Sequence, residues 1–206
     1  MIKKFLFSIF FIFLISFVYA DSTEFNIVTS SGFQFSEISS THQKAQSLDE
    51  LNQMIQNNEN KLNEEINSMN KNQKIIYENQ NKVRNSIYSL LSMENLIPNI
   101  GILVSDIARQ LNGSVQKIII AEEKIQKRNF FVRFFLGGDK KSADEIETEL
   151  KLNEKRISDL ETLKLRCECS GEIKNIFEQQ IQIIKEEQNR LQRLIDSEKS
   201  SNGLFS

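Results

Sequence analysis

The sequence predicts an all-α fold, built either as elongated antiparallel helical hairpins of the coiled-coil kind or as a partial four-helix bundle. Three observations support this class. The 206 residues are rich in Glu, Lys, Gln, Asn, Ile and Leu, with one proline and no tryptophan. Apolar residues recur at helical spacing over most of the chain. Two Ser-x-x-Glu sequences precede long periodic segments, a pattern typical of a helix start.

The first element, residues 1–20, has the pattern of a secretory signal peptide. Two lysines precede an apolar run from Phe5 to Val18, and a peptidase site ends at Ala20. The run is too short for a membrane span, which needs roughly 20 residues. We therefore expect a secreted or cell-envelope protein cleaved after Ala20. Without cleavage, the same segment would leave the protein membrane-anchored.

The second element, residues 21–46, contains nine Ser or Thr and is expected to form a flexible tail. It holds the only histidine, His42, for which we expect a solvated side chain rather than a general base or metal ligand. Beyond the signal peptide the chain has 24 basic and 28 acidic residues, a net charge of −4. That balance provides no positive field for nucleic acid.

Residues 47–136 are predicted to form a long helical hairpin broken near Pro98, because proline ends or kinks a helix. Ser47 and Glu50 are expected to cap its first helix, 48–96. Ten asparagines between positions 52 and 81 leave that helix a narrow apolar stripe, which recurs every seven residues at Leu48, Ile55, Leu62, Met69, Ile76 and Val83. The more apolar second helix is expected to continue through residue 136.

The hairpin ends in four phenylalanines, Phe130, Phe131, Phe134 and Phe135. On a helical wheel at about 100° per residue, these rings project away from the apolar stripe of their helix. Three interpretations remain open: a returning helix covers the rings, a protein partner binds them, or they rest on a bilayer surface. The flanking basic residues suit the bilayer, and they are Lys127, Arg128, Arg133, Lys140 and Lys141.

A Gly-Gly elbow at 137–142 is expected to separate this hairpin from a second one at 143–198. Ser142 and Glu145 belong to the second Ser-x-x-Glu sequence and are expected to cap the third helix. The remaining predicted boundaries are a turn at 167–171 and a frayed tail at 199–206.

Cys167 and Cys169 are the only cysteines, and an even count in an exported protein favours oxidation. A disulfide across one residue is geometrically demanding. Three roles stay open: a structural cap of the turn, intermolecular bonds between hairpin tips, and a redox or metal role. Two thiolates are half of a zinc site, so one chain cannot complete such a site from Cys and His.

The rest of the chain lacks the groups of an enzyme site. The glycine pair Gly137-Gly138 has no strand before it, as a phosphate-binding loop would need. Carboxylates alternate with Lys and Arg, as in Glu147, Lys151 and Glu154, which is typical of a solvated helix face. We therefore expect no catalytic residue, no cofactor, no metal and no small-molecule substrate.

Residues from about 84 to 205 resemble a group of uncharacterised small secreted coiled-coil proteins of methanogenic archaea. The resemblance rests on four stretches: SDIARQLNGSVQKIIIAEEKIQKRNFFVRFFLGGDKKSADEIE, RISDLETL, CEC and EQQIQIIKEEQNRLQRLI. Its most specific part is the aromatic run that ends in Gly-Gly-Asp before an acidic helix. The resemblance implies an envelope-facing protein and supplies no activity or catalytic residues.

The sequence thus indicates a non-enzymatic, exported coiled-coil protein that acts as a spacer, scaffold or protein-binding module at the cell envelope. Its partner would be another protein or a second copy, bound through the helices. One alternative is a peripheral membrane-binding protein that uses the patch Phe130–Phe135. Another is a thiol redox or metal protein that uses Cys167 and Cys169.

Overall fold

A computed structural model describes residues 42–67 and 69–205. The predicted signal peptide, 1–20, and residues 21–41 of the predicted tail lie outside the described residues. The described part contains no strand, which confirms the all-α prediction. Its helices are α1 (Leu48–Asn67), α2 (Lys71–Ser92), the 3₁₀ helix η1 (Glu94–Leu96), α3 (Gly101–Lys127), α4 (Phe130–Leu136), α5 (Lys140–Leu165) and α6 (Gly171–Ser200).

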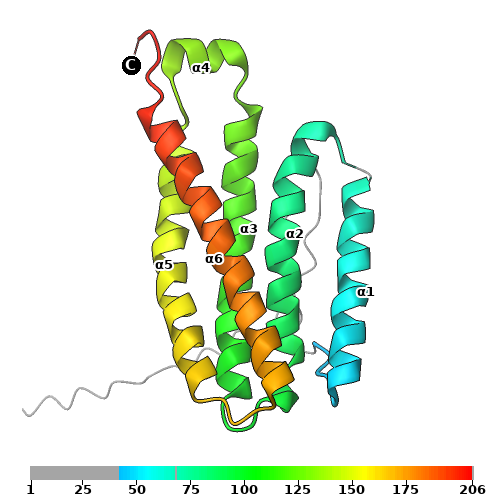
Figure 1. The fold of residues 1–206 in the computed structure, drawn as a ribbon. Coiled ribbons are helices and arrows are strands. Elements are labelled where there is room, and N and C mark those ends of the chain that lie inside the picture. The colour runs from blue at the N-terminus through cyan, green and yellow to red at the C-terminus, as the bar shows by residue number, and fades with distance from the viewer. Residues whose placement is uncertain (1–41, 68, 206) are drawn as a thin grey trace, which may run out of the picture.

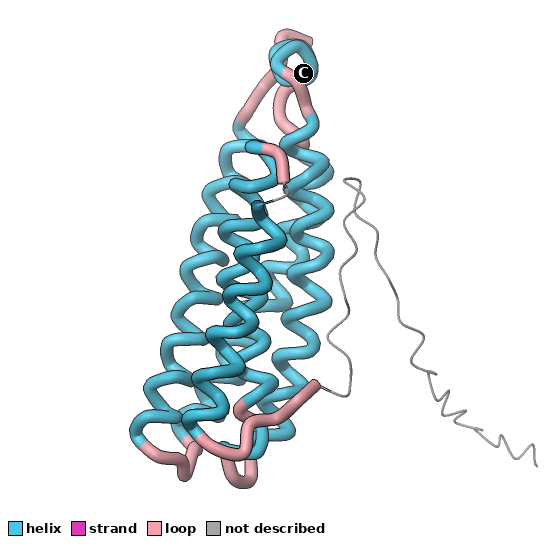
Figure 2. The backbone as a smooth tube through the Cα atoms, turned by 90° about the vertical axis from the view of Figure 1, so that its right-hand side faces the viewer, coloured by secondary structure: helices cyan, strands magenta, loops and turns pink. Residues whose placement is uncertain are grey.

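Four helices, α2, α3, α5 and α6, form an antiparallel bundle, in which α2 and α5 run downwards and α3 and α6 run upwards in the view of Figure 1. α2 packs against α3 and α6, and α5 packs against the same two helices. α1 lies outside this ring, against α2. Seen from the side, the helices follow one long axis (Figure 2), so the molecule is a rod.

The two ends of the rod differ, and each is given a name. The turn end carries the α2–α3 connection, which contains Pro98 as predicted, and the α5–α6 connection at 166–170, predicted at 167–171. The tip is the opposite end, where α4 and the C-terminal segment lie (Figure 1). It comprises residues 127–141 and 198–205.

Apolar side chains fill the rod in two clusters. The larger cluster lies among α1, α2 and the neighbouring parts of α3, α5 and α6, with Tyr77 and Phe177 fully buried. The smaller cluster lies towards the tip, among α3, α5 and α6 alone, and includes Ile125 and Ile195. The rod therefore narrows from five helices to three before it reaches the tip (Figure 1).

The structure corrects the predicted continuous helix 48–96. α1 ends at Asn67, the chain reverses, and α2 begins at Lys71 and packs against α1. The Asn70 side chain accepts from the Gln73 amide at 3.1 Å, and the Gln73 side chain accepts from the Asn70 amide at 3.3 Å. This is a capping box of Asn and Gln. The seven-residue apolar repeat runs through the turn because both helices face one core.

Residues 42–46 are not a flexible tail, contrary to the prediction. Ala45 is fully buried, and its amide donates to the Ser92 carbonyl oxygen at 2.8 Å. His42, predicted to be solvated, places Nε2 2.9 Å from Ser92 Oγ. Its ring meets that of Tyr88 edge to face at 4.3 Å between centroids. The segment before α1 is thus part of the packed turn end.

Ser47 caps α1 as predicted, since its Oγ accepts from the Glu50 amide at 3.2 Å. The Glu50 carboxylate reaches back one residue further than predicted and accepts from the Gln46 amide at 2.7 Å. Side chains therefore satisfy two backbone amides at the start of α1, those of Gln46 and Glu50.

The structure corrects the predicted elbow at 137–142 and the second predicted cap. α5 begins two residues before Ser142, and its N-cap is Asp139, whose side chain accepts from the Ser142 amide at 3.1 Å. An aspartate is as good an N-cap as a serine, and this one comes earlier in the chain. Glu145 pairs with Lys124 of α3 at 2.8 Å instead of capping.

The helix after Pro98 does not continue through residue 136. α3 ends at Lys127, two residues leave the helix, and α4 starts afresh. Asn129 caps α4 by accepting from the Val132 amide at 2.9 Å. Because α4 has its own axis, the wheel drawn along α3 does not apply to it. Leu136, the last residue of α4, is 59% exposed.

Candidate functional site

α4 lies across the end of the bundle, between the ends of α3 and α5 (Figure 1). Its sequence is Phe-Phe-Val-Arg-Phe-Phe-Leu, and none of these seven residues is buried. A helix of this length is unstable in isolation. Without apolar burial to hold it, α4 depends on polar contacts at its two ends.

The four phenylalanines predicted as a patch are exposed on α4. Phe130 and Phe131 are 75% and 69% exposed, and Phe134 and Phe135 are 50% and 38% exposed. Phe130 stacks on Phe134 with ring centroids 6.0 Å apart, and Phe134 meets Phe135 edge to face at 5.1 Å. No helix of the described chain covers these rings, so the interpretation of a returning helix is wrong.

A buried carboxylate, that of Glu198 in α6, anchors α4 from below. Its side chain is 2% exposed. One oxygen accepts from the Arg133 guanidinium at 2.7 Å, and the other accepts from the Asp139 amide at 2.8 Å. Charge-assisted hydrogen bonds of this length are strong. Glu198 therefore fastens both α4 and the start of α5 to the end of α6.

The glycine pair allows the backbone to pass close to α6. Gly137 has a φ of 77°, which favours glycine. A Cβ atom on Gly138 would lie 2.0 Å from the carbonyl oxygen of Glu198. The pair predicted as a helix stop is thus also the point where two backbones touch.

The predicted frayed tail, 199–206, instead packs along α4 in its described part. α6 continues to Ser200, and the chain then turns back. The amides of Leu204 and Phe205 donate to the carbonyl oxygens of Phe134 and Phe135 at 3.0 and 3.1 Å. The Phe205 ring stacks on that of Phe135 at 5.6 Å. These contacts satisfy carbonyls that the end of a helix leaves open.

The tip is positively charged, although the chain as a whole has a net charge of −2. Residues 127–141 and 198–205 contain six basic and two acidic side chains, a net charge of +4. The two acids are Asp139, 3.6 Å from Arg128, and Glu198 beneath Arg133. Lys140 and Lys141, at the start of α5, are exposed.

A layer of buried polar side chains separates the two apolar clusters. Gln80 of α2 donates to Glu122 of α3 at 2.7 Å and to Glu187 of α6 at 2.8 Å. Arg190 donates to both carboxylates at 2.6 to 2.9 Å. These hydrogen bonds join three helices, so the layer fixes how they align along the rod.

The charged groups in this layer shift one another's pKa values. Burial raises the pKa of Glu122, and the nearby Glu187 adds to the shift, while Arg190 opposes it. Burial alone would lower the pKa of Arg190, but its bonds to Glu187 and Glu122 outweigh burial and raise it. The guanidinium therefore stays charged and serves the packing of the bundle.

A disulfide joins Cys167 to Cys169, with Cα atoms 5.2 Å apart. Of the three roles left open, this arrangement corresponds to the structural cap of the α5–α6 turn. No free cysteine remains in the described chain.

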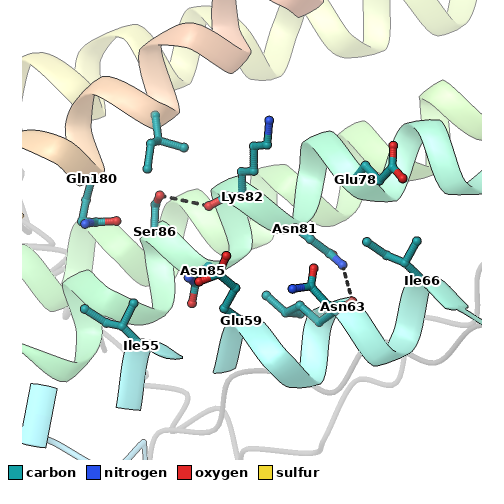
Figure 3. Close-up of a pocket in the computed structure, with 12 residues that line it drawn as sticks. Ile55, Glu59, Asn63, Ile66, Glu78, Asn81, Lys82, Asn85, Ser86 and Gln180 are labelled. Carbon is teal, nitrogen blue, oxygen red and sulfur yellow. Dashed lines mark hydrogen bonds between the residues drawn. The ribbon is translucent and has the colours of Figure 1, made fainter. Parts of the chain in front are cut away.

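A groove of about 490 Å³ lies between α1, α2 and α6 (Figure 3). Its lining is partly aliphatic, with Ile55 and Ile66, and partly amide, with Asn81 among others. Ser86 is the one hydroxyl among the described residues that line it, and it donates to the Lys82 carbonyl oxygen at 3.0 Å. The serine hydroxyl is thus held by the backbone, and the groove is the space between α1 and the bundle.

Within residues 42–67 and 69–205, no three His, Cys, Asp or Glu side chains gather in a way that would hold a metal ion. Nor does any helix in these ranges combine the length and apolar character that crossing a membrane requires.

The four rings could be identified from the sequence, but the residues that anchor α4 were not predicted. Asn129 could have been predicted as an N-cap, because an asparagine before an apolar run is typical of that position. The role of Glu198 could not have been predicted, since it lies among other charged residues of α6 and its burial depends on the return of α4. Gly203 likewise could not be singled out from the sequence, because its need for a missing side chain arises only where its backbone passes close to that of Gly137.

No protein-family model, no curated protein and no solved structure matches this chain.

Proposed function

We propose that the protein is a non-enzymatic binding module, an exported helical rod that acts as a spacer or scaffold at the cell envelope and docks through its tip. The observation that carries this proposal is the exposure of Phe130, Phe131, Phe134 and Phe135 on a helix anchored by Glu198. Exposed apolar patches of this kind mark interaction sites in soluble proteins.

Polar contacts at the tip hold α4 in a position that leaves its phenylalanine rings exposed. Burying one phenylalanine would stabilise a fold by about 1.5–3 kcal/mol. Instead, the Arg133–Glu198 ion pair and the amides of Leu204 and Phe205 hold α4 with its rings outward. A surface held in this way loses little conformational entropy on docking, so preorganisation favours binding.

Other polar features of the rod support a structural role for the rest of the chain. The charges of Glu122, Glu187 and Arg190 are directed at one another inside the bundle. The groove beside α1 pairs its hydroxyl with a backbone carbonyl. The cluster of exposed rings at the tip is a feature that packing within the described chain does not account for.

Two features support export. Residues 1–20 have the charge and apolar pattern of a signal peptide. The disulfide between Cys167 and Cys169 suits an oxidising compartment.

Site-specific photo-crosslinking on intact envelopes tests the proposal. A photoreactive phenylalanine analogue replaces Phe131 at the tip or, as the control, Leu165, which is 78% exposed at the turn end. We expect adducts, with protein or with lipid, from position 131 and few from position 165. Equal yields at the two positions, or no adduct from 131, would contradict docking through the tip.

A further inference from the structure

We infer that the surface on which the tip docks is an anionic lipid bilayer, with α4 lying in the interface and the rod standing away from it. This inference rests on the proposed function, which requires only that the tip docks. Three properties of the tip support it: the orientation of α4, the state of its backbone, and its charge.

The orientation of α4 suits a flat surface. α4 lies across the rod rather than along it (Figure 1), so its axis is parallel to any plane on which the rod stands. Large apolar side chains exposed at this end are Phe130, Phe131, Phe134, Phe135, Leu136, Leu204 and Phe205. Helices that lie in a membrane interface have this arrangement, with the apolar face immersed and basic residues at the level of the headgroups.

Backbone polar groups at the tip are already hydrogen-bonded, as an apolar environment requires. A carbonyl or amide that enters the acyl region without a partner costs several kcal/mol. The carbonyl oxygens of Arg133, Phe134 and Phe135 accept from the amides of Gly137, Leu204 and Phe205 at 2.9 to 3.1 Å. Arg128 donates to the carbonyl oxygen of Gly137 at 3.0 Å. The end of α4 thus carries few open acceptors to desolvate.

The charge of the tip selects anionic lipid. Its net charge of +4 includes Lys199, which is paired with acidic residues one turn further along α5, and the other five basic side chains of the tip exceed its two acids by three. Asp144 and Glu147 pair with Lys199, and Glu145 pairs with Lys124. Basic side chains close to an anionic membrane contribute roughly 1 kcal/mol each.

A protein partner is the weaker interpretation. The tip is the narrowed, outermost end of the rod (Figure 1), so a rigid partner would need a matching hollow. A bilayer deforms around such a shape and needs no complementary fold. Protein occupancy therefore stands as an outcome of the test.

Co-sedimentation with vesicles tests the inference. The full chain, as recovered after export, is mixed at low ionic strength with vesicles of phosphatidylcholine alone or of equal parts phosphatidylcholine and phosphatidylglycerol. All variants share residues 1–20 and their processing, so a difference between variants belongs to the mutated site.

Two double variants form a matched pair. F131S/F134S removes apolar side chains that are 69% and 50% exposed at the tip, and I102S/L103S removes side chains that are 67% and 52% exposed near the turn end. We expect F131S/F134S to weaken binding to anionic vesicles about a hundredfold, and I102S/L103S to leave it unchanged. Circular dichroism should show both variants folded, because the removed side chains are exposed.

A third variant tests the contribution of positive charge to vesicle binding. K140Q/K141Q should weaken binding to anionic vesicles about thirtyfold, and should leave the weaker binding to phosphatidylcholine almost unchanged. Added salt should reduce the difference between wild type and this variant.

The inference is overturned if wild type fails to sediment with anionic vesicles, or if F131S/F134S and I102S/L103S bind them equally well. The crosslinking experiment then separates the two proposals. Protein adducts from position 131 would leave docking through the tip intact with a protein as occupant, whereas the absence of adducts would remove both.

Discussion

The two ends of the rod solve the same structural problem in opposite ways. Both must close a set of helices and satisfy their backbone groups. The turn end closes by packing: Ala45 is fully buried, His42 packs on Tyr88 of α2, and a disulfide joins the two cysteines of the α5–α6 turn. The tip closes by polar anchoring around Glu198 and leaves its rings in solvent. Aromatic exposure at the tip is therefore a feature of that end and not of the fold.

Charge separates the ends as well. The turn end, taken as residues 42–50, 93–101 and 164–172, has three basic and five acidic side chains, a net charge of −2. The tip has a net charge of +4. A rod with this asymmetry orients in the field of an anionic surface, with the tip towards it.

The largest expected effect compares one glycine from each end. Gly138→Ala should destabilise the protein by about 3 kcal/mol, because backbone atoms must move to admit the new methyl group. Gly171→Ala, at the start of α6, should change stability by less than about 1 kcal/mol, since nothing lies within 4 Å of the added atom. Urea unfolding followed by circular dichroism measures both. Equal midpoints would show that the tip is not packed as described.

The next comparison removes one buried carboxylate from each end. Glu198→Ala leaves Arg133 and the Asp139 amide without their acceptor, and should cost about 2 kcal/mol once the partial exposure of Arg133 is considered. Glu94→Ala at the turn end loses a pair with Lys44, which is one-third exposed, and should cost about 1 kcal/mol.

The readout that distinguishes the two ends is vesicle binding. Glu198→Ala frees α4 and should weaken binding, whereas Glu94→Ala should not. Undiminished binding by folded Glu198→Ala would mean that the rings dock without their anchor.

These two ends also show what could be predicted from the sequence. Some features that depend on local sequence were predicted correctly. Ser47 caps α1, Pro98 lies in the connection after α2, and the four phenylalanine rings lie outside the core. The capping box of Asn70 and Gln73 is also a local pattern, but it was not predicted because it differs from the Ser-x-x-Glu sequence in both residues. A continuous seven-residue repeat could not reveal that α1 ends at Asn67, because two helices facing one core share the same spacing.

Contacts between distant parts of the chain could not be predicted in this way. The packing of the half-buried His42 against α2 joins segments fifty positions apart, and the burial of Glu198 depends on the return of Asp139. A solvated histidine and a packed one have the same local sequence. The difference arises when elements meet, which periodicity and capping rules do not describe.

Removal of the disulfide should have a smaller effect, confined to the turn end. Cys167→Ser with Cys169→Ser opens a loop of three residues, so the entropic gain of the unfolded chain amounts to about 1.5 kcal/mol. Thermal unfolding with and without reductant measures the loss in wild type. Vesicle binding should be the same for both forms, and a binding defect on reduction would contradict the independence of the two ends.

The smallest expected effect is a loss of turn-end packing in mild acid. Burial lowers the pKa of His42 from its ordinary value of 6.5, and the charge of Arg109 lowers it further. The unfolded chain then binds the proton more readily than the folded one. The stability that depends on neutral His42 is therefore present above pH 6.5 and is lost as pH falls through the folded pKa.

His42 is the only histidine, so its imidazole resonance can be followed alone by NMR. We expect its midpoint below 6.5, and a stability loss in this range that His42→Gln lacks. Burial alone would raise the pKa of Glu94, but its pairing with Lys44 outweighs burial and lowers it, so its stabilising contribution is present above pH 4.5 and is lost only as pH falls below that value. The acid loss from His42 therefore precedes the loss from carboxylates. A midpoint above 6.5 would instead place His42 in solvent or beside an unneutralised acid, and the turn end would lose its distinction as the end closed by packing.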